Sequence, residues 1–179
     1  FIPTGIIGYF LYKVVKQYLL GNSNIVLWSL MLGGIALIVL EIYLKRRKIT
    51  EKDITKVSYK DALIIGIIQS ISVIPGVSRA AATIFGGMAL GMDRKTAVEF
   101  SFLLAIPTML AATGLDLAKT SFNFSTQEWS VLAVGFITSY LVAIIAIKLL
   151  MSYVRRFSFI PFGIYRIIIA ILLFGFFLR

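Results

Sequence analysis

The sequence has 179 residues, of which 59% are hydrophobic and 15% are charged, against about 25% charged residues in an average soluble domain. One small core cannot bury so much apolar surface, so a soluble globular enzyme is excluded. Several apolar runs approach the roughly 20 residues that cross a bilayer as a helix. The composition therefore predicts an all-α polytopic membrane protein, and it excludes disordered, collagen-like and disulfide-rich chains.

The chain contains no cysteine and no histidine. Thiolate nucleophiles, disulfides, imidazole bases and the usual zinc sites are therefore excluded for this chain alone. Its net charge of +10 does not predict nucleic-acid binding, because Lys and Arg collect in the cytoplasmic loops of membrane proteins. Carboxylates, hydroxyls, Lys, Arg and backbone groups are left as the candidate chemistry.

We interpret residues 1–179 as a single membrane domain. The sequence begins at Phe1, without Met, inside an apolar run. We therefore expect a fragment that lacks its amino-terminal part. The apolar pattern predicts five membrane spans, at about residues 2–20, 25–44, 97–117, 129–150 and 160–178.

Three features modify these spans. Lys13 and Lys16 interrupt the first span, and Pro107 predicts a kink in the third. Gly33-Gly34 lies in the middle of the second span, where small residues let a neighbouring helix approach; simple tolerance of glycine is an equal alternative.

The distribution of basic residues predicts which loops are cytoplasmic. The loops at 45–60, 93–95 and 151–158 hold seven, two and two Lys or Arg, whereas those at 21–24 and 119–128 hold only Lys119. The positive-inside rule places the first set in the cytoplasm, although Lys13 and Lys16 lie toward the opposite side.

Residues 62–92 predict a re-entrant helix pair. Ser58 and Asp61 have the spacing of a capping box, so a helix should begin near Tyr59. Its apolar part rises only about 20 Å, which is too short to cross about 30 Å of hydrocarbon. Pro75-Gly76 then breaks the helix, and a second short apolar piece leads back. Irregular backbone at that depth survives only if it is buried in protein or lines a cavity.

Arg79 follows this break and is the principal candidate for function. An ionisable group at bilayer depth costs at least about 2.5–3.5 kcal/mol, so it needs a partner. Its guanidinium suits phosphate, while Ser78 stands where the helix restarts and its free N–H groups converge. Gly76 allows close backbone approach, and Thr83 lies on the same helical face. The residues favour a phosphate site, with a structural pairing of Arg79 with Glu99 or with backbone carbonyls as the alternative.

The residues of this motif also resemble a known family. The run Gln69–Thr83, followed by Gly86-Gly87, by residues 99–102, by Pro107 and by residues 159–166, resembles undecaprenyl-diphosphate phosphatases. These integral membrane enzymes of the bacitracin-resistance type recycle the lipid carrier of the bacterial cell wall.

The resemblance implies two inverted repeats whose re-entrant tips meet at an active site. It assigns catalytic roles to Arg79, Ser78 and Thr83, and phosphate binding to Gly76 with the same three residues. Gln69 and Glu99 are supporting candidates. A hydrogen bond of Gln69 at the site and one between helices are equal alternatives, and for Glu99 the alternatives are orienting Arg79 and lying in the membrane interface. The family's Ser-Arg-Ser pattern is changed here, because Ala80 replaces the last hydroxyl.

The family's upstream motif, rich in glutamate and containing histidine, has no match in this sequence. The resemblance implies that a metal ion, Mg²⁺ or Ca²⁺, would be held mainly by those upstream residues and by the substrate. The nucleophile or base is expected there too, so this chain alone should be incomplete as an enzyme.

The predicted function is hydrolysis of undecaprenyl (polyprenyl) diphosphate to the monophosphate and inorganic phosphate in the bacterial inner membrane. The expected partners are the lipid, the membrane and, as a further expectation, a second copy in a homodimer; nucleic acid is not expected. A transporter or flippase for an anionic lipid or solute is the alternative, because broken helices and buried charges also occur there. A scaffold in which Arg79 is only structural is a third.

The re-entrant assignment predicts that residues 62–92 begin and end on the same side of the membrane. Single cysteines placed in the 45–60 loop and beside Arg94 should react with an impermeant maleimide from the same face. The native sequence has no cysteine, so each label reports one position. Labelling from opposite faces would contradict the assignment.

Overall fold

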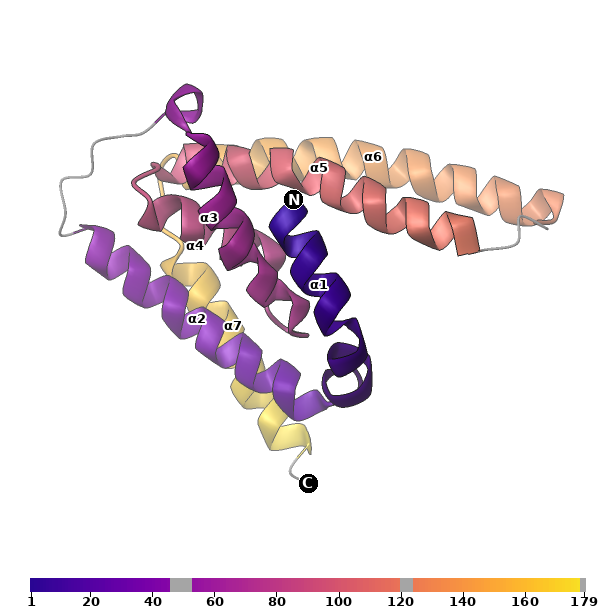
Figure 1. Cartoon of the computed structure of the whole chain (residues 1–179), viewed down its shortest axis with the longest axis horizontal. Helices are drawn as coiled ribbons and strands as arrows, with labels where there is room; N and C mark the ends of the chain where they lie inside the picture. The colour runs from indigo at the N-terminus through magenta and orange to yellow at the C-terminus, as the bar shows by residue number, and fades with distance from the viewer. Residues whose placement is uncertain (46–52, 120–123, 178–179) are drawn as a thin grey trace. The chain divides into compact units, whose positions relative to one another are not determined.

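The computed structural model describes residues 1–45, 53–119 and 124–177. These residues form helices joined by short turns, and no strand occurs among them. The α-helices are α1 (Ile2–Val14), α2 (Ser23–Lys45), α3 (Tyr59–Gln69), α4 (Arg79–Ala89), α5 (Arg94–Lys119), α6 (Thr126–Val154) and α7 (Ile160–Phe177) (Figure 1). A π-helical segment η1 (Val15–Leu19) continues α1, and 3-10 turns η2 (Ile54–Lys56) and η3 (Ser70–Val73) flank α3. The all-α prediction is confirmed.

Local capping explains where two helices begin. The Ser58 hydroxyl accepts from the Asp61 N–H, and the Asp61 carboxylate accepts from the Ser58 N–H at 2.8 Å. This capping box starts α3 at Tyr59, as predicted. Before α2, the Asn22 side-chain oxygen accepts from the N–H of Asn24 at 3.1 Å, which satisfies a donor that the first helical turn leaves free.

Helices α3 and α4 form the predicted hairpin. Each has 11 residues, so each rises only about 16 Å, well short of a bilayer. The chain breaks at Pro75-Gly76 and returns so closely that a Cβ on Gly86 would lie 3.2 Å from Ile68. The structure confirms the two short helices and the break; their place in a membrane stays a prediction.

The described chain divides into two compact units. The first comprises residues 1–104 and 158–179, and the second comprises residues 105–157, with the end of α5 and all of α6. Helices α2 and α7 pack together inside the first unit. A Cβ on Gly34 would lie 2.7 Å from the carbonyl oxygen of Gly163. The prediction that Gly33-Gly34 admits a neighbouring helix is therefore confirmed.

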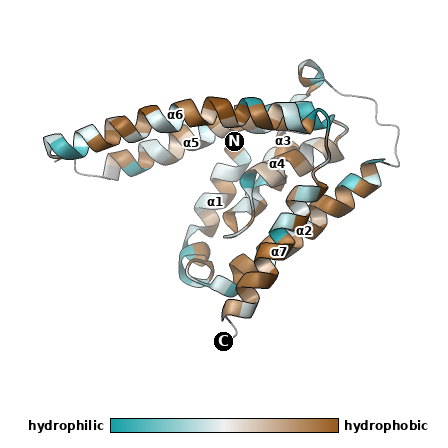
Figure 2. Cartoon of the chain, turned by 180° about the vertical axis from the view of Figure 1, so that it is seen from behind, coloured by the Kyte–Doolittle hydropathy of each residue, from teal (hydrophilic) through white to brown (hydrophobic). Residues whose placement is uncertain are grey.

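Three helices are long and apolar enough to cross a membrane: Ser23–Lys45, Arg94–Ala118 and Thr126–Val154. The shorter segment Ile160–Phe176 is also apolar. Many large apolar side chains along these helices are exposed, and Figure 2 shows hydrophobic colour along α2, α6 and α7. Water would disfavour so much exposed apolar surface, whereas lipid would not. The chain is a multi-pass membrane protein.

The helix bounds lie close to the predicted spans. Helices α2, α5, α6 and α7 match the second to fifth spans to within about three or four residues at each end. The first span is made by α1 and η1 together, and the α-helical part has only 13 residues. Residues 46–52 of the predicted cytoplasmic loop, 120–123 of the opposite loop and residue 178 of the last span lie outside the described residues.

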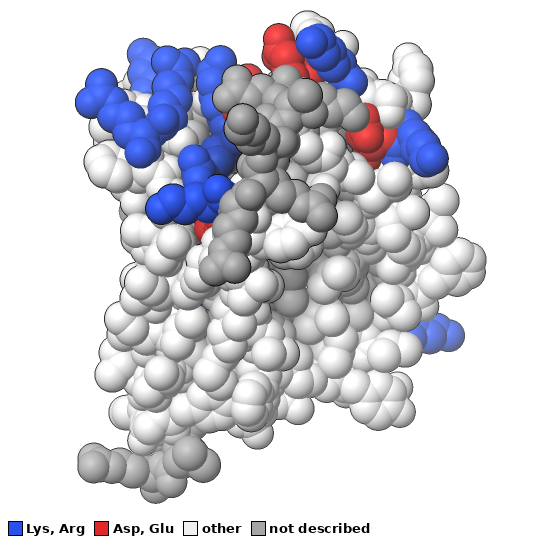
Figure 3. Space-filling view, turned by 90° about the vertical axis from the view of Figure 1, so that its left-hand side faces the viewer, with Lys and Arg blue, Asp and Glu red and all other residues white. Residues whose placement is uncertain are grey.

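Glu41 joins the ends of three helices on one side of the first unit. Its carboxylate accepts two hydrogen bonds from the Arg94 guanidinium, both of 2.8 Å. It also accepts from the Phe159 N–H at 2.9 Å. The Glu41 side chain is 2% exposed, so its charge depends on these three donors. In Figure 3, most Lys and Arg (blue) and Asp and Glu (red) side chains on the face shown lie near the top of the view.

Replacing Glu41 with Leu should lower the free energy of unfolding by about 3 kcal/mol. This value is at the lower end of the range for removing one partner of a buried ion pair, because the Arg94 side chain that remains can still reach water. Thermal and denaturant unfolding in detergent micelles would measure the loss. The double variant Glu41→Leu/Arg94→Met should recover part of it.

Lys95→Met is the matched control. It removes an ion pair with Glu99 whose partners are 45% and 34% exposed, so it should cost at most about 1 kcal/mol. Equal losses for Glu41→Leu and Lys95→Met would contradict the assigned role of Glu41.

Candidate phosphate site at the hairpin turn

Gly76 forms the tip of the hairpin and is required there by its conformation. Its φ is +89°, and a Cβ at this position would lie 2.6 Å from the carbonyl oxygen of Val26 in α2. A side chain is excluded on both grounds. The Gly76 carbonyl accepts from Nη2 of Arg166 in α7 at 3.0 Å. The tip is therefore held between α2 and α7.

Ser78 begins α4, as predicted. Its backbone is extended, and its hydroxyl oxygen accepts from the Ala81 N–H at 3.2 Å. This bond makes Ser78 the N-cap of α4, and it leaves the hydroxyl proton free to donate to a ligand. Ser78 thus has a structural role, and it keeps the donor needed for the predicted phosphate contact.

Arg79 is the first residue of α4 and carries an unpaired donor. Its Nη1 atom is buried and has no hydrogen-bond partner among the described residues. The same holds for both side-chain amide atoms of Gln69, the last residue of α3, which is 0% exposed. Buried polar groups without a partner cost about 1–3 kcal/mol, and more when charged. Such groups are rare in native proteins, so Arg79 and Gln69 are candidates for contact with a bound ligand or water.

Thr83 is 2% exposed and donates its hydroxyl proton to the Arg79 carbonyl at 2.6 Å. That bond uses the donor that was predicted to reach phosphate, so the structure assigns Thr83 first to supporting the turn that carries Arg79. Its catalytic role stays a prediction.

Glu99 forms an ion pair with Lys95 at 3.4 Å, one helical turn away. No ion pair between Arg79 and Glu99 occurs among the described residues. Both roles predicted for Glu99, orienting Arg79 and pairing with it structurally, need that contact.

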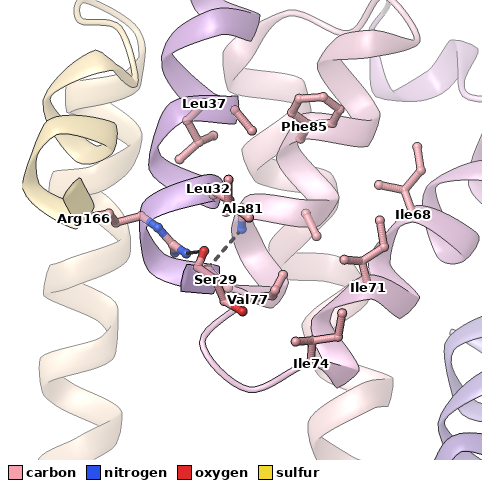
Figure 4. Close-up of a pocket in the computed structure, with 14 residues that line it drawn as sticks. Ser29, Leu32, Leu37, Ile68, Ile71, Ile74, Val77, Ala81, Phe85 and Arg166 are labelled. Atoms are coloured by element: carbon pink, nitrogen blue, oxygen red, sulfur yellow. Dashed lines mark hydrogen bonds between the residues drawn. The ribbon is translucent and has the colours of Figure 1, made fainter. Parts of the chain in front are cut away.

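A cavity of about 460 Å³ lies beside the turn. Apolar side chains of α2, α3, η3 and α4 line most of it, including the small side chains of Ala81 and Ala82. Its polar members are Ser29, Ser78 and Arg166 (Figure 4). Ser78 therefore faces this space, whereas Arg79 does not line it.

Arg166 contacts the turn although sequence reasoning assigned it no role in the site, and its hydrogen bonds to backbone groups are structural. Besides Gly76, it donates to the carbonyls of Ser29 at 3.3 Å and Leu30 at 3.4 Å. The available signal was an arginine three residues after Gly163 inside an apolar helix, because a charge at such a position needs partners.

The described residues do not fit a metal site by themselves. No group of three acidic side chains that could hold an ion occurs among them. Glu41 is paired with Arg94, Asp61 with Ser58, and Asp93 accepts from Thr96. Hard cations need several oxygen ligands together, so no step of the chemistry is derived through a metal here.

The fold and the site define a class: a multi-pass α-helical membrane protein with a broken helix pair. Directly after the break stands an arginine whose buried Nη1 has no partner among the described residues. A family model described as bacitracin resistance protein BacA matches residues 1–172. The chain belongs to this family, which confirms the resemblance seen in its motifs.

Named relatives agree with that assignment. Undecaprenyl-diphosphatases of Sulfurihydrogenibium sp. and Aquifex aeolicus are each 49% identical, over 96% and 99% of this chain and 68% and 69% of their own lengths. One of Methanococcus aeolicus is 45% identical over 100% of this chain and 69% of its own length. The chain thus spans about two thirds of these relatives.

The two roles of Ser78 can be separated by substitution. Ser78→Ala removes both the cap and the hydroxyl, whereas Ser78→Gly removes the hydroxyl but costs the helix start only a few tenths of a kcal/mol. If the hydroxyl contacts phosphate, both variants should lose about 1–3 kcal/mol of transition-state binding, measured as kcat/KM for phosphate release.

Ala80→Ser is the control, because Ala80 is exposed one residue beyond Arg79 and should change little. Full activity of Ser78→Gly would mean that Ser78 is only a cap. A large gain from Ala80→Ser would mean that the binding hydroxyl belongs at position 80.

Proposed function

We propose that this chain forms the phosphate-binding part of an enzyme that hydrolyses undecaprenyl, or another polyprenyl, diphosphate to the monophosphate and inorganic phosphate. The observation that carries the proposal is the buried, unpaired Nη1 of Arg79 at the first turn of α4. Membership of a family whose relatives are named undecaprenyl-diphosphatase supports it. The transporter alternative finds no support in those names.

The chemistry assigned to these residues is electrostatic. Negative charge is spread over the phosphoryl oxygens during transfer, and a guanidinium held in place beforehand stabilises that charge without reorganising. Arg79 would bind the phosphoryl group that is released. Ser78 would donate its free hydroxyl proton to the same group, and the first N–H groups of α4 add the positive end of the helix dipole.

The other residues have supporting tasks in this proposal. Gly76 lets the backbone turn sharply, and Thr83 holds the Arg79 carbonyl at 2.6 Å. The amide of Gln69, fully buried without a partner, would hydrogen-bond a substrate oxygen or an attacking water. We place the reaction in the bacterial inner membrane, and Mg²⁺ or Ca²⁺, if used, would be held by residues other than those described.

Arg79→Met in the complete natural protein should abolish most phosphate release from polyprenyl diphosphate in detergent or in vesicles. Arg79→Lys should rescue it poorly, because a point charge cannot make bidentate contacts with phosphate oxygens. The melting temperature of Arg79→Met should be unchanged or higher, since the variant removes a buried donor that has no partner.

This pairing of measurements separates a catalytic role from a structural one. A structural arginine would show the reverse result, with lost stability and retained specific activity. Headgroup movement across vesicles without phosphate release would support the transporter instead.

A further inference from the structure

The inference concerns Arg166, and it rests on the proposed function of the turn at residues 75–79. Arg166 comes from α7, far along the chain from the turn, yet its guanidinium reaches the tip. Nη2 donates to the Gly76 carbonyl at 3.0 Å and to the Ser29 carbonyl at 3.3 Å, while Nε donates to the Leu30 carbonyl at 3.4 Å. One side chain thus joins three elements: α2, α7 and the hairpin tip.

The acceptors on α2 lie within a helix. A carbonyl oxygen has two lone pairs, so Ser29 and Leu30 can accept a helical N–H and the guanidinium together. The Gly76 carbonyl differs, because it belongs to a turn where no helix supplies a donor. Arg166 therefore satisfies a polar backbone group that would otherwise cost free energy in an apolar setting.

The position of Arg166 is determined by contacts along one face of α7. Phe159, Gly163 and Arg166 have the i, i+4, i+7 spacing of a single helical face. The Phe159 N–H is bound by Glu41, Gly163 touches Gly34, and Arg166 lies against Gly33. The contacts of Phe159 and Gly163 thus fix this face of α7 against α2, and Arg166 on the same face lies beside the hairpin tip.

Gly33 provides the space that the guanidinium occupies. The three atoms nearest to a Cβ at this position would all belong to Arg166, with Nη2 at only 2.7 Å. An added methyl group would therefore displace the guanidinium. The clash is with the far end of a flexible side chain, so the guanidinium can move while the backbones of α2 and α7 stay in place.

We propose that Arg166 is a positioning residue for the reaction: it holds the Gly76 carbonyl and so sets the direction in which the turn presents Ser78 and Arg79. It acts through the backbone of the tip, two and three residues before those side chains. Figure 4 shows its guanidinium directed toward Ser29, beside the turn that joins η3 to α4. A displacement of about 1 Å at such a site can cost about 100-fold in rate.

The first measurement is steady-state kinetics of phosphate release by the complete protein. Arg166→Met should lower kcat by about 10- to 100-fold with little change in KM, and Arg166→Lys should restore part of kcat because it keeps a donor. A rise in KM with unchanged kcat would overturn the proposal and indicate direct substrate binding.

The second measurement is a double-mutant cycle with Gly33. Gly33→Ala alone should reproduce the loss in kcat. In the Arg166→Met background it should add little, because the guanidinium that it displaces is already gone. Gly135→Ala, where nothing lies within 4 Å of the added methyl, is the matched control and should leave kcat unchanged. Additive losses from Gly33→Ala and Arg166→Met would overturn the proposal.

The third measurement does not require activity. Hydrogen exchange of the peptide covering residues 71–78 should become at least tenfold faster in Arg166→Met and Gly33→Ala, because the tip loses its support. A peptide from α6 should exchange as in the wild type. Unchanged exchange at residues 71–78 would overturn the proposal, whereas faster exchange in a protein that releases no phosphate would retain the positioning role and reject the proposed function.

Discussion

The close contact between α2 and α7 is the constraint on which the rest of the site depends. Gly34 and Gly163 let the two backbones touch, since a Cβ on either would lie 2.7 Å from the other's carbonyl oxygen. Inside a bilayer the hydrophobic effect does not drive helices together, because lipid tails are as apolar as the helix side chains. Contacts between helices therefore rely on close packing between small residues. This contact places Arg166 beside Gly33 and within reach of the hairpin tip. Without it, the guanidinium could not join the two helices to the turn.

The hairpin turn illustrates how irregular backbone is stabilised in an apolar protein. Each polar group that leaves the helical ladder needs a partner. Arg166 of α7 donates to the Gly76 carbonyl, and the Ser78 hydroxyl accepts from the Ala81 N–H, which the first turn of α4 leaves without a helical partner. The Gly76 carbonyl and the Ala81 N–H thus have partners, whereas Nη1 of Arg79 and the side-chain amide of Gln69 have none among the described residues. This difference separates the groups that hold the turn from those that remain available to a ligand.

Two arginines at the turn thus have different surroundings. Arg166 donates from Nε and Nη2 to three backbone carbonyls, so the fold holds its guanidinium in place. Arg79 keeps a buried donor without a partner, at the N-terminus of a helix where anions are favoured. The family assignment is consistent with this distinction. In a diphosphatase, one cationic side chain would bind phosphate, and a rigid support would hold that side chain in position.

Much of this protein followed from sequence alone, for reasons of local chemistry. Apolar run lengths predicted the long helices, the spacing of Ser58 and Asp61 predicted where α3 begins, and Pro75-Gly76 predicted the break. Ser78 was predicted at the start of α4 for the same reason: caps, turns and helix lengths depend on residues within a few positions of one another.

Only the tertiary structure decided which residues meet across the chain. Glu41 is separated from Arg94 by 53 positions and Arg166 from Gly76 by 90, and no periodicity in one helix specifies its register against another. The structure also paired Glu99 with Lys95 and used the Thr83 hydroxyl on the backbone. Hydrogen bonds require partners within about 3 Å, and that proximity is set by how whole helices pack.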